Sequence, residues 1–307
     1  MKSAICTLFE GSYHYGVAAL INSLYHQGYR GVIYVGYRGQ LPPWSAGAVA
    51  NLALAWPGSC TLRIAAELVV YFLPLDTPYH FTNYKPDFML RLWDDVAQEA
   101  NAIFYFDPDI VVTTPWSIFE EWVTCGVALC EDIHSPKPMH HPIRKAWRQY
   151  FGDKGFTLNF KEPTYANGGF IGVGRPHRSF LTMWQALQEA MAPAIGGLGT
   201  SFFVTLPVAL PFAPFGIPDQ DALNATVEAW DGPVSFVDKG GMAFTSSASL
   251  MSHAIGNGKP WARKPLAHIV AGEPPRRADR DYWQAAKGPI ISQPASLIRR
   301  RQLADSL

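Results

Sequence analysis

The sequence predicts an α/β protein with a mostly parallel central sheet flanked by helices. Short apolar runs alternate along the chain with segments of helical periodicity, which is the pattern of strands joined by crossover helices. The runs are continuously apolar, as in strands that are buried on both faces. The chain has 307 residues, 48% of them apolar and 16% charged, so it is long and apolar enough to form a sizeable core.

The first half of the chain follows this alternation regularly. Residues 16–27 place Ala19, Leu20 and Leu24 on one helical face. Pro43 stands in the first turn of a second predicted helix, where proline is tolerated. The predicted strands are 4–9, 31–35, 68–73 and 102–106, and the predicted helices are 16–27, 43–55 and 86–100.

The second half is less regular. Residues 132–164 are rich in His, Pro, Lys and aromatic residues and are predicted to form an insertion, and the Gly- and Pro-rich segment 195–218 is expected to wrap around a site. Without an internal repeat or a clear linker, we predict one domain over 1–265 and a C-terminal extension over 266–307 that packs on it or forms a tail. The predicted strands are 126–130 and 170–173, and the predicted helices are 144–151, 179–191 and 219–230.

The charge balance argues against a nucleic-acid-binding protein. The chain has 25 basic and 25 acidic residues and a formal net charge of zero, so it lacks the basic excess that binds phosphate backbones. Its basic cluster, Arg299-Arg300-Arg301, follows Leu297 and Ile298. This cluster is interpreted as a solvated tail or as a weak membrane-surface contact.

The cysteines and the apolar runs predict a cytoplasmic protein without a membrane span. Cys6, Cys60, Cys125 and Cys130 are scattered, without zinc-ligand spacing, and are expected to be free thiols in a reducing compartment. The N-terminus leads directly into a strand pattern without a signal-peptide stretch. No apolar run approaches the roughly 20 residues of a transmembrane helix.

Two aspartates lie at the end of the predicted strand 102–106. Ligands of parallel sheets bind beyond the carboxyl ends of the strands, which is where Asp107-Pro108-Asp109 falls. Carboxylates one residue apart can hold a hard divalent cation, and the cation can hold a diphosphate. The alternative is an ordinary turn or helix cap after a strand.

A histidine and a small-residue turn follow much later in the chain. His253 is a candidate third metal ligand, and Gly256, Gly258 and Lys259 form a turn that ends in a cation. Such a turn lets backbone N–H groups approach phosphate oxygens, and the lysine adds a point charge. The alternatives are a structural histidine and a surface loop with a chance lysine.

Two further motifs precede apolar elements. Asp219-Gln220-Asp221 puts three polar side chains at the start of a helix, and capping explains one of them. In Asn167-Gly168-Gly169, the amide can bind sugar hydroxyls while the glycines let a sugar lie against the backbone. The alternative for this motif is a plain turn into a strand.

These motifs supply what glycosyl transfer from a nucleotide sugar requires. The negative charge that develops on the diphosphate leaving group must be neutralised, and a divalent metal held by carboxylates and an imidazole can do this. The donor sugar and the acceptor hydroxyl must also be held in attack geometry. In their order the motifs resemble the GT-A (Rossmann-like nucleotide-diphospho-sugar transferase) fold glycosyltransferases. The resemblance is closest to glycosyltransferase family 8, which contains glycogenin and bacterial lipopolysaccharide galactosyl- and glucosyltransferases.

The resemblance covers roughly residues 3–262. The two motifs beginning at Asp219 and at His253 are its most specific parts. The motifs that carry it are Tyr13-x-x-Gly16 with Ser23-Leu24, Asp107-Pro108-Asp109, Asn167-Gly168-Gly169, Asp219-Gln220-Asp221-Ala222-Leu223-Asn224, and the run from His253 through Gly256, Asn257 and Lys259 to Trp261.

The resemblance implies a role for each matching residue. It implies Mn²⁺ (or Mg²⁺) held by Asp107, Asp109 and His253, with Asp107 also contacting the ribose. Gln220 would lie beneath the anomeric carbon, and Asp221 would support the site or contact the sugar. The implied diphosphate residues are Gly256 and Lys259, the implied sugar residues are Asn167, Gly168, Gly169 and Asp219, and the implied uracil pocket is Thr7, Leu8 and Tyr13.

The chain also departs from the family. Gly168 stands where the family usually has a small residue such as alanine, and Phe9-Glu10-Gly11 replaces the usual acidic or amide residues after the first strand, so Glu10 is a candidate reader of the base. The family also has a basic residue on the helix before the Asp-x-Asp strand. Arg91 fits its usual spacing and is favoured, and Lys85 resembles the corresponding residue of related GT-A families. Region 132–164 has no counterpart; its members His140, His141, Arg144, Trp147 and Tyr150 either line an acceptor site or belong to a solvated loop.

The resemblance implies a metal-dependent retaining transferase that moves a hexose from a UDP-sugar to a carbohydrate or glycolipid acceptor by front-face attack. An inverting transferase on the same fold, with Asp219 or Asp221 as the base, is the second hypothesis. The third is a nucleotide-sugar-binding protein without turnover.

Overall fold

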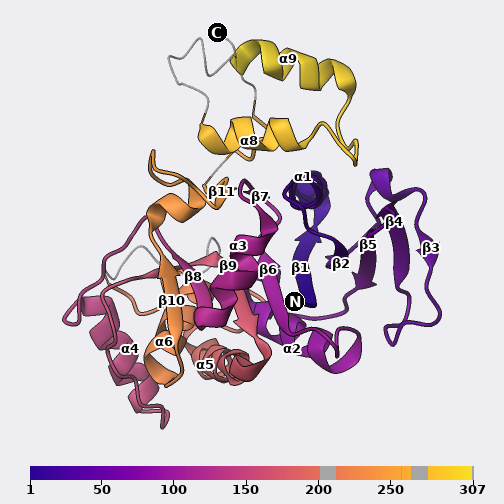
Figure 1. Ribbon diagram of the computed structural model, residues 1–307. Coiled ribbons are helices and arrows are strands. Elements are labelled where there is room, and N and C mark those ends of the chain that lie inside the picture. The colour runs from indigo at the N-terminus through magenta and orange to yellow at the C-terminus, as the bar shows by residue number, and fades with distance from the viewer. Residues whose placement is uncertain (201–211, 257, 264–275, 306–307) are drawn as a thin grey trace. The chain divides into compact units, whose positions relative to one another are not determined.

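A computed structural model describes residues 1–200, 212–256, 258–263 and 276–305 (Figure 1). Asn257 and parts of the predicted segments 195–218 and 266–307 lie outside the described residues. The chain divides into two compact units, which are considered one at a time. Unit 1 comprises Met1–Ser3, Asp76–Tyr105 and Glu121–Asp238, and unit 2 comprises Ala4–Leu75, Phe106–Glu120 and Lys239–Leu307.

The predicted α/β class, with mostly parallel strands flanked by helices, is confirmed. In unit 2, β1 pairs in parallel with β2 and β2 with β5, and the strand order is β1-β2-β5-β4-β3. Consecutive residues are buried along Ala4–Phe9 of β1 and Ile33–Tyr37 of β2, so these two strands are covered on both faces as predicted. The bounds are β1 Ser3–Glu10, α1 His14–His26, β2 Gly31–Arg38, β3 Val49–Ala50, β4 Cys60–Ala65 and β5 Leu68–Pro74.

The predicted helix over 43–55 is wrong. Pro43–Ser45 forms one 3-10 turn, and Val49–Ala50 is the edge strand β3. The Asn51 side chain accepts hydrogen bonds from the backbone N–H groups of Ala53 and Leu54, both at 3.2 Å. Such local side-chain bonds offer the backbone an alternative to the helix.

Unit 1 carries the second group of strands, in the order β10-β8-β9-β6. β10 is parallel to β8, and β8 is antiparallel to β9. Helix α5 packs against both α2 and α6 (Figure 1). The bounds are α2 Lys85–Asp95, β6 Ala102–Phe106, β8 Val127–Glu131, α4 Pro142–Gly152, β9 Ala166–Gly174, α5 Ser179–Ile195, α6 Pro218–Ala229 and β10 Val234–Val237. Helix α3, Trp116–Trp122, belongs mostly to unit 2.

Two C-terminal helices, α8 (Arg277–Ala285) and α9 (Ala295–Asp305), belong to unit 2 (Figure 1). They bury a small core that includes Ala19 of α1, with Tyr282 and Trp283 from α8. Arg301 of the predicted basic cluster is buried, and its guanidinium lies 4.9 Å from the centroid of the Trp283 ring. Among the helices of the described ranges, none has the length and hydropathy needed to span a membrane.

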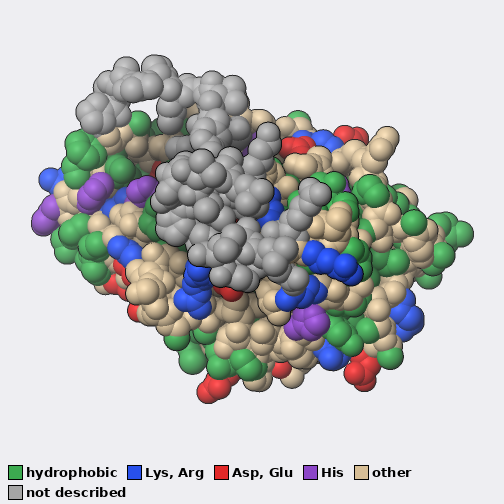
Figure 2. All heavy atoms as spheres, turned by 90° about the horizontal axis from the view of Figure 1, so that it is seen from above, with side chains coloured by type: hydrophobic (Ala, Val, Ile, Leu, Met, Phe, Trp, Pro, Cys, Tyr) green, Lys and Arg blue, Asp and Glu red, His purple; other side chains and the backbone are tan. Residues whose placement is uncertain are grey.

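Charged side chains of both signs occur on the face drawn in Figure 2. Outside the atoms in grey, Lys and Arg side chains lie among acidic and hydrophobic side chains. Some of the exposed charges are paired, as in the contact of Arg178 with Asp94 at 2.8 Å. Exposed pairs of this kind contribute little to stability.

Candidate active site

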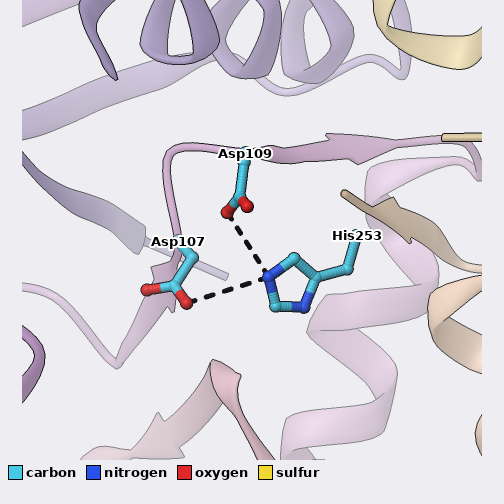
Figure 3. Close-up of side chains that lie close together, drawn as sticks. All are labelled: Asp107, Asp109 and His253. Carbon is cyan, nitrogen blue, oxygen red and sulfur yellow. Dashed lines mark ion pairs between the residues drawn. The ribbon is translucent and has the colours of Figure 1, made fainter. Parts of the chain in front are cut away.

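Asp107, Asp109 and His253 converge in unit 2 (Figure 3). Asp107 follows β6, Asp109 precedes β7 (Ile110–Val112), and His253 ends β11 (Met251–His253). The Nε2 atom of His253 lies 3.3 Å from Asp109 Oδ1 and 3.9 Å from Asp107 Oδ2. One ligand atom from each residue lies within 4.8 Å of the other two, so the three candidate ligands form one cluster.

The ribbon of β7 and β11 explains why a distant histidine reaches the aspartates. The two strands pair antiparallel, with His253 opposite Ile110, the residue after Asp109. The Ala254 N–H donates to the Asp109 carbonyl at 3.1 Å, which extends the ladder into the Asp-Pro-Asp turn. The backbone therefore fixes the imidazole beside the carboxylates.

Helix α1 supports the same turn through Gly16. A Cβ at this position would lie 2.1 Å from the Pro108 carbonyl oxygen and 2.8 Å from the Trp261 ring. Real Cβ atoms do not approach other atoms so closely, so a side chain at Gly16 would displace the turn. The glycine at position 16 of this motif thus has a packing cause.

The cluster suits a divalent cation. Two carboxylates and an imidazole are donors that Mn²⁺ and Mg²⁺ accept, and the side chains of Asp109 and His253 are only 5% and 7% exposed. The His253 Nδ1 atom is buried without a hydrogen-bond partner in the described ranges. Burial alone would raise the pKa of Asp109, but His253 and Lys259 beside it hold that pKa well below its usual value. Asp109 is therefore kept ionised, as a metal ligand must be.

Lys259 reaches the cluster from the loop that follows β11. Its Nζ donates to Asp109 Oδ2 at 2.6 Å and to the Ala254 carbonyl at 2.9 Å. Burial lowers the pKa of Lys259, but the charge and the hydrogen bond of Asp109, together with the smaller effects of Tyr13 and Asp107, raise that pKa above its ordinary value. Gly256 and Gly258 have φ of +77° and +78°, a conformation that favours glycine.

The candidate base-binding residues also lie in unit 2. Tyr13 is 36% exposed, and its ring meets Trp261 edge-on at 5.5 Å. Thr7 and Leu8 are buried in β1, and the Thr7 hydroxyl has no hydrogen-bond partner among the described residues. Glu10, the alternative reader of the base, forms an ion pair with Arg38 at 3.2 Å.

In unit 1, the three polar side chains at the start of α6 bind different partners. Asp219 accepts from Lys85 Nζ at 3.0 Å, and Gln220 Oε1 accepts from the Gly168 N–H at 2.9 Å. Asp221 accepts from the Ile217 N–H at the start of the helix and from the Tyr165 hydroxyl, each at 2.7 Å. Each of the three side chains therefore binds a segment outside α6. The Gln220 Nε2 amide is buried without a hydrogen-bond partner in the described part of the chain.

The Asn167-Gly168-Gly169 motif begins β9 and is completed by a residue that the sequence analysis missed. Asn167 Nδ2 donates to Asp132 Oδ2 at 2.7 Å, and Asn167 Oδ1 accepts from the Gly169 N–H at 2.9 Å. Asp132 follows the end of β8 as Asp107 follows the end of β6. The rule that ligands bind at strand ends therefore also points to Asp132.

Of the two candidate basic residues, Lys85 contacts the motifs that contain Gly168 and Asp219. Its buried ammonium donates to the Gly168 carbonyl at 2.8 Å and to Asp219. Arg91 lies further along α2, is 41% exposed, and pairs with Asp95 at 3.1 Å. The structure thus brings Lys85 into hydrogen-bond contact with Gly168 and Asp219.

Three residues of the predicted insertion 132–164 bind within unit 1. Arg144 is buried and pairs with Glu228 at 2.5 Å, and Trp147 is buried as well. The Tyr150 hydroxyl donates to the Ala190 carbonyl at 2.9 Å. His140 and His141 precede α4, and His141 Nδ1 accepts from the Ile143 N–H at 3.3 Å, which caps that helix.

Several solved glycosyltransferases share this fold. The apo bifunctional glycosyltransferase WbbM aligns over 98% of this chain and 52% of its own, with a TM-score of 0.54 and 14% identity. The galactosyltransferase LgtC, in complex with donor and acceptor sugar analogues, aligns over 95% of this chain and 98% of its own, with a TM-score of 0.52 and 15% identity. GlyE from Streptococcus pneumoniae aligns over 100% of this chain and 64% of its own, with a TM-score of 0.53 and 15% identity.

The chain spans about half the length of WbbM and nearly all of LgtC. No protein-family model and no curated protein sequence matches it significantly. At such low identity the likeness concerns the fold, and it confirms the fold that the order of the motifs predicts. The chain has the GT-A fold of these glycosyltransferases.

Proposed function

We propose that this protein is a metal-dependent retaining glycosyltransferase that moves a hexose from a UDP-sugar to a carbohydrate or glycolipid acceptor. The observation that carries the proposal is the convergence of Asp107, Asp109 and His253 within 4.8 Å on a glycosyltransferase fold. These residues would hold Mn²⁺ or Mg²⁺. When bound, the cation supplies positive charge that neutralises the diphosphate leaving group.

Lys259 and the turn around it are assigned to the diphosphate. The positive φ of Gly256 and Gly258 turns the backbone sharply, as in loops whose N–H groups bind phosphate oxygens. Lys259 adds an ammonium that already lies 2.6 Å from Asp109. Thr7, Leu8 and Tyr13 are assigned to uracil, and the unpartnered Thr7 hydroxyl supports this assignment.

The donor sugar is assigned to the residues gathered around α6 and β9. Asn167, Gly168, Gly169 and Asp219 would bind its hydroxyls. Lys85 is the donor-binding cation that we favour over Arg91, because Lys85 holds both Gly168 and Asp219. The Gln220 amide would lie beneath the anomeric carbon, and this role is supported by its buried Nε2, for which the described residues offer no hydrogen-bond acceptor. An active-site variant of LgtC replaces a glutamine by glutamate, so a glutamine belongs to that protein's active site as well.

Retention is favoured over inversion because the candidate bases are engaged. Asp219 pairs with Lys85, and the two Asp221 oxygens accept from the Tyr165 hydroxyl and the Ile217 N–H, each at 2.7 Å. In front-face attack, the bond from the anomeric carbon to the diphosphate breaks and the bond to the acceptor oxygen forms on the same face. The departing phosphate oxygen takes the acceptor proton, so no carboxylate base is needed.

A cytoplasmic location is part of the proposal. Its support is the state of the four cysteines, which are free thiols. Disulfides are rare in reducing compartments.

The test is a donor screen by the purified protein. UDP-glucose, UDP-galactose, UDP-GlcNAc and GDP-mannose are offered with Mn²⁺, and the release of nucleoside diphosphate is measured. We expect release from a UDP-sugar, its loss with EDTA, and its loss in Asp109→Ala. The matched control is Asp153→Ala, at the exposed C-terminus of α4.

Release that persists in Asp109→Ala, or that is indifferent to EDTA, would refute the metal assignment. Metal-dependent binding of UDP without any release would favour a nucleotide-sugar-binding protein. The anomeric configuration of a transfer product decides between retention and inversion.

A further inference from the structure

Lys137 is a buried lysine of unit 1, and no carboxylate of the described residues lies in hydrogen-bond contact with its ammonium. The residue is 7% exposed. Within the described residues its ammonium contacts aromatic rings, at 3.1 Å from the centroid of Tyr165 and 6.0 Å from that of Trp147, and makes no hydrogen bond or ion pair. Buried lysines are rare unless they are paired, so a bound anion would compensate the charge of this ammonium.

The two carboxylates that act on Lys137 through space are engaged elsewhere. Both Asp221 oxygens are taken, Oδ1 by the Tyr165 hydroxyl and Oδ2 by the Ile217 N–H. Asp132 Oδ1 accepts from the His134 N–H at 2.8 Å, and Oδ2 accepts from Asn167. Among the described residues, negative charge therefore lies near the ammonium, but none of them accepts a hydrogen bond from it.

These contacts also connect Lys137 to the residues assigned to the donor sugar. The Tyr165 ring under the ammonium is fully buried, and Tyr165 lies two residues before Asn167. Asp132 binds Asn167, and Asp221 belongs to the same turn of α6 as Gln220. Burial lowers the pKa of Lys137, and the charges of Asp221 and Asp132 oppose that effect. The Tyr165 ring and the carboxylates of Asp132 and Asp221 therefore surround the lysine beside the residues assigned to the donor sugar.

We propose that Lys137 binds an anionic group of the acceptor, either the carboxylate of a sugar acid or the phosphate of a sugar phosphate. This inference rests on the proposed function, because it takes the acceptor to enter beside Asn167 and Asp221. The ring of Tyr165 covers one side of the ammonium, and its N–H groups can donate charge-assisted hydrogen bonds to anionic oxygens. A neutral sugar leaves the ammonium without its counter-ion, so the site selects for charge.

The test uses three probes that differ at one position. Methyl β-D-glucuronide, methyl β-D-glucoside 6-phosphate and neutral methyl β-D-glucoside are titrated into the protein with Mn²⁺ and UDP, and the dissociation constants are measured by isothermal titration calorimetry. We expect at least one anionic probe to bind about tenfold more tightly than the glucoside. Tighter binding of the glucuronide would indicate a sugar acid as the acceptor, and tighter binding of the 6-phosphate would indicate a sugar phosphate.

Lys137→Met should remove this preference, and Lys137→Gln provides a second variant that is polar but uncharged. Thermal melting of both variants checks that they fold. The matched control is Lys154→Met in the same insertion, since this exposed lysine also faces a tyrosine ring, at 5.1 Å from the centroid of Tyr150. The Lys154→Met variant should prefer the anionic probes over the glucoside as strongly as the unsubstituted protein does.

Equal affinity of the unsubstituted protein for all three probes would overturn the inference, as would a preference that survives in either folded Lys137 variant. The binding of UDP with Mn²⁺ is measured first. Its absence would indicate that the proposed function fails, whereas UDP binding without an anion preference would indicate that only this inference fails.

Discussion

His253 Nε2 lies 3.3 Å from Asp109 Oδ1 because β11 and β7 pair with His253 opposite Ile110. The imidazole is fixed by a backbone ladder and is therefore preorganised for a ligand. A site built on paired strands loses less entropy on binding than one built on a free loop.

His253→Ala should weaken Mn²⁺ binding by at least about tenfold, because it removes the nitrogen ligand and leaves the two carboxylates. Isothermal titration with MnCl₂ measures the change. His140→Ala, an exposed histidine of unit 1, is the control and should leave the affinity unchanged. Equal affinities of the two variants would contradict the role of His253.

Gly16→Ala should destabilise unit 2 by about 1–3 kcal/mol, because its Cβ would overlap the Pro108 carbonyl oxygen. Thermal denaturation should show a lower midpoint than for the unsubstituted chain. Gly152→Ala is the matched control, since a Cβ at that residue of α4 meets no atom within 4 Å. A Gly16→Ala variant as stable as this control would disprove the close approach.

Arg276→Gln should loosen the loop that carries Lys259. Arg276 donates to the Ile255 carbonyl at 3.2 Å and to the Gly258 carbonyl at 2.8 Å, so it ties the loop to the start of α8. We expect UDP affinity in the presence of Mn²⁺ to fall about tenfold. Arg277→Gln is the control, because Arg277 donates to the Ser247 carbonyl instead, at 2.8 Å. A similar loss in both variants would indicate a general charge effect.

Asp221 should make stability fall as the pH rises toward neutrality. Burial raises its pKa to about 7, although Lys137, the Ile217 N–H and Tyr165 act in the opposite direction. The ordinary value is 3.8, so between about pH 4 and pH 7 the folded chain keeps a proton that the unfolded chain has lost. The stabilisation is complete below pH 4 and is lost as the pH rises through 7, with a slope of at most about 1.4 kcal/mol per pH unit.

Urea denaturation from pH 5 to pH 8 measures this effect. Asp221→Asn should flatten the decline in the free energy of unfolding, because asparagine does not titrate. The control Asp153→Asn lies at the exposed end of α4 and should keep the full slope. Parallel curves for Asp221→Asn and the unsubstituted chain would contradict the raised pKa.

Much of the fold followed from local patterns. The buried strands were predicted because apolar runs of five or six residues leave few alternatives, and Asp107 and Asp109 were found because they end one of these runs. The helix over 43–55 failed because Asn51 bonds its own neighbours, which periodicity does not register. The three-residue strands β7 and β11 are too short to leave a periodic signal.

The candidate site also combines residues that local sequence patterns identify with residues that only tertiary packing brings together. His253 was assigned through the family resemblance, since the pairing that brings it to Asp109 is tertiary. Lys137 was missed because a lysine in a polar loop predicts exposure, and its burial against Tyr165 depends on the packing of α4 and α6 in unit 1. Asp132 also lies at the end of a predicted strand, so the rule that identified Asp107-Pro108-Asp109 could have identified Asp132 as well.

The central claim is that Asp107, Asp109 and His253 together bind one divalent cation. The most direct measurement is an anomalous difference map from crystals grown with Mn²⁺ and UDP. The account predicts one manganese peak about 2.0–2.6 Å from a carboxylate oxygen of each aspartate and from His253 Nε2. A fully bound UDP with no peak there, or with manganese held by other residues, would contradict it.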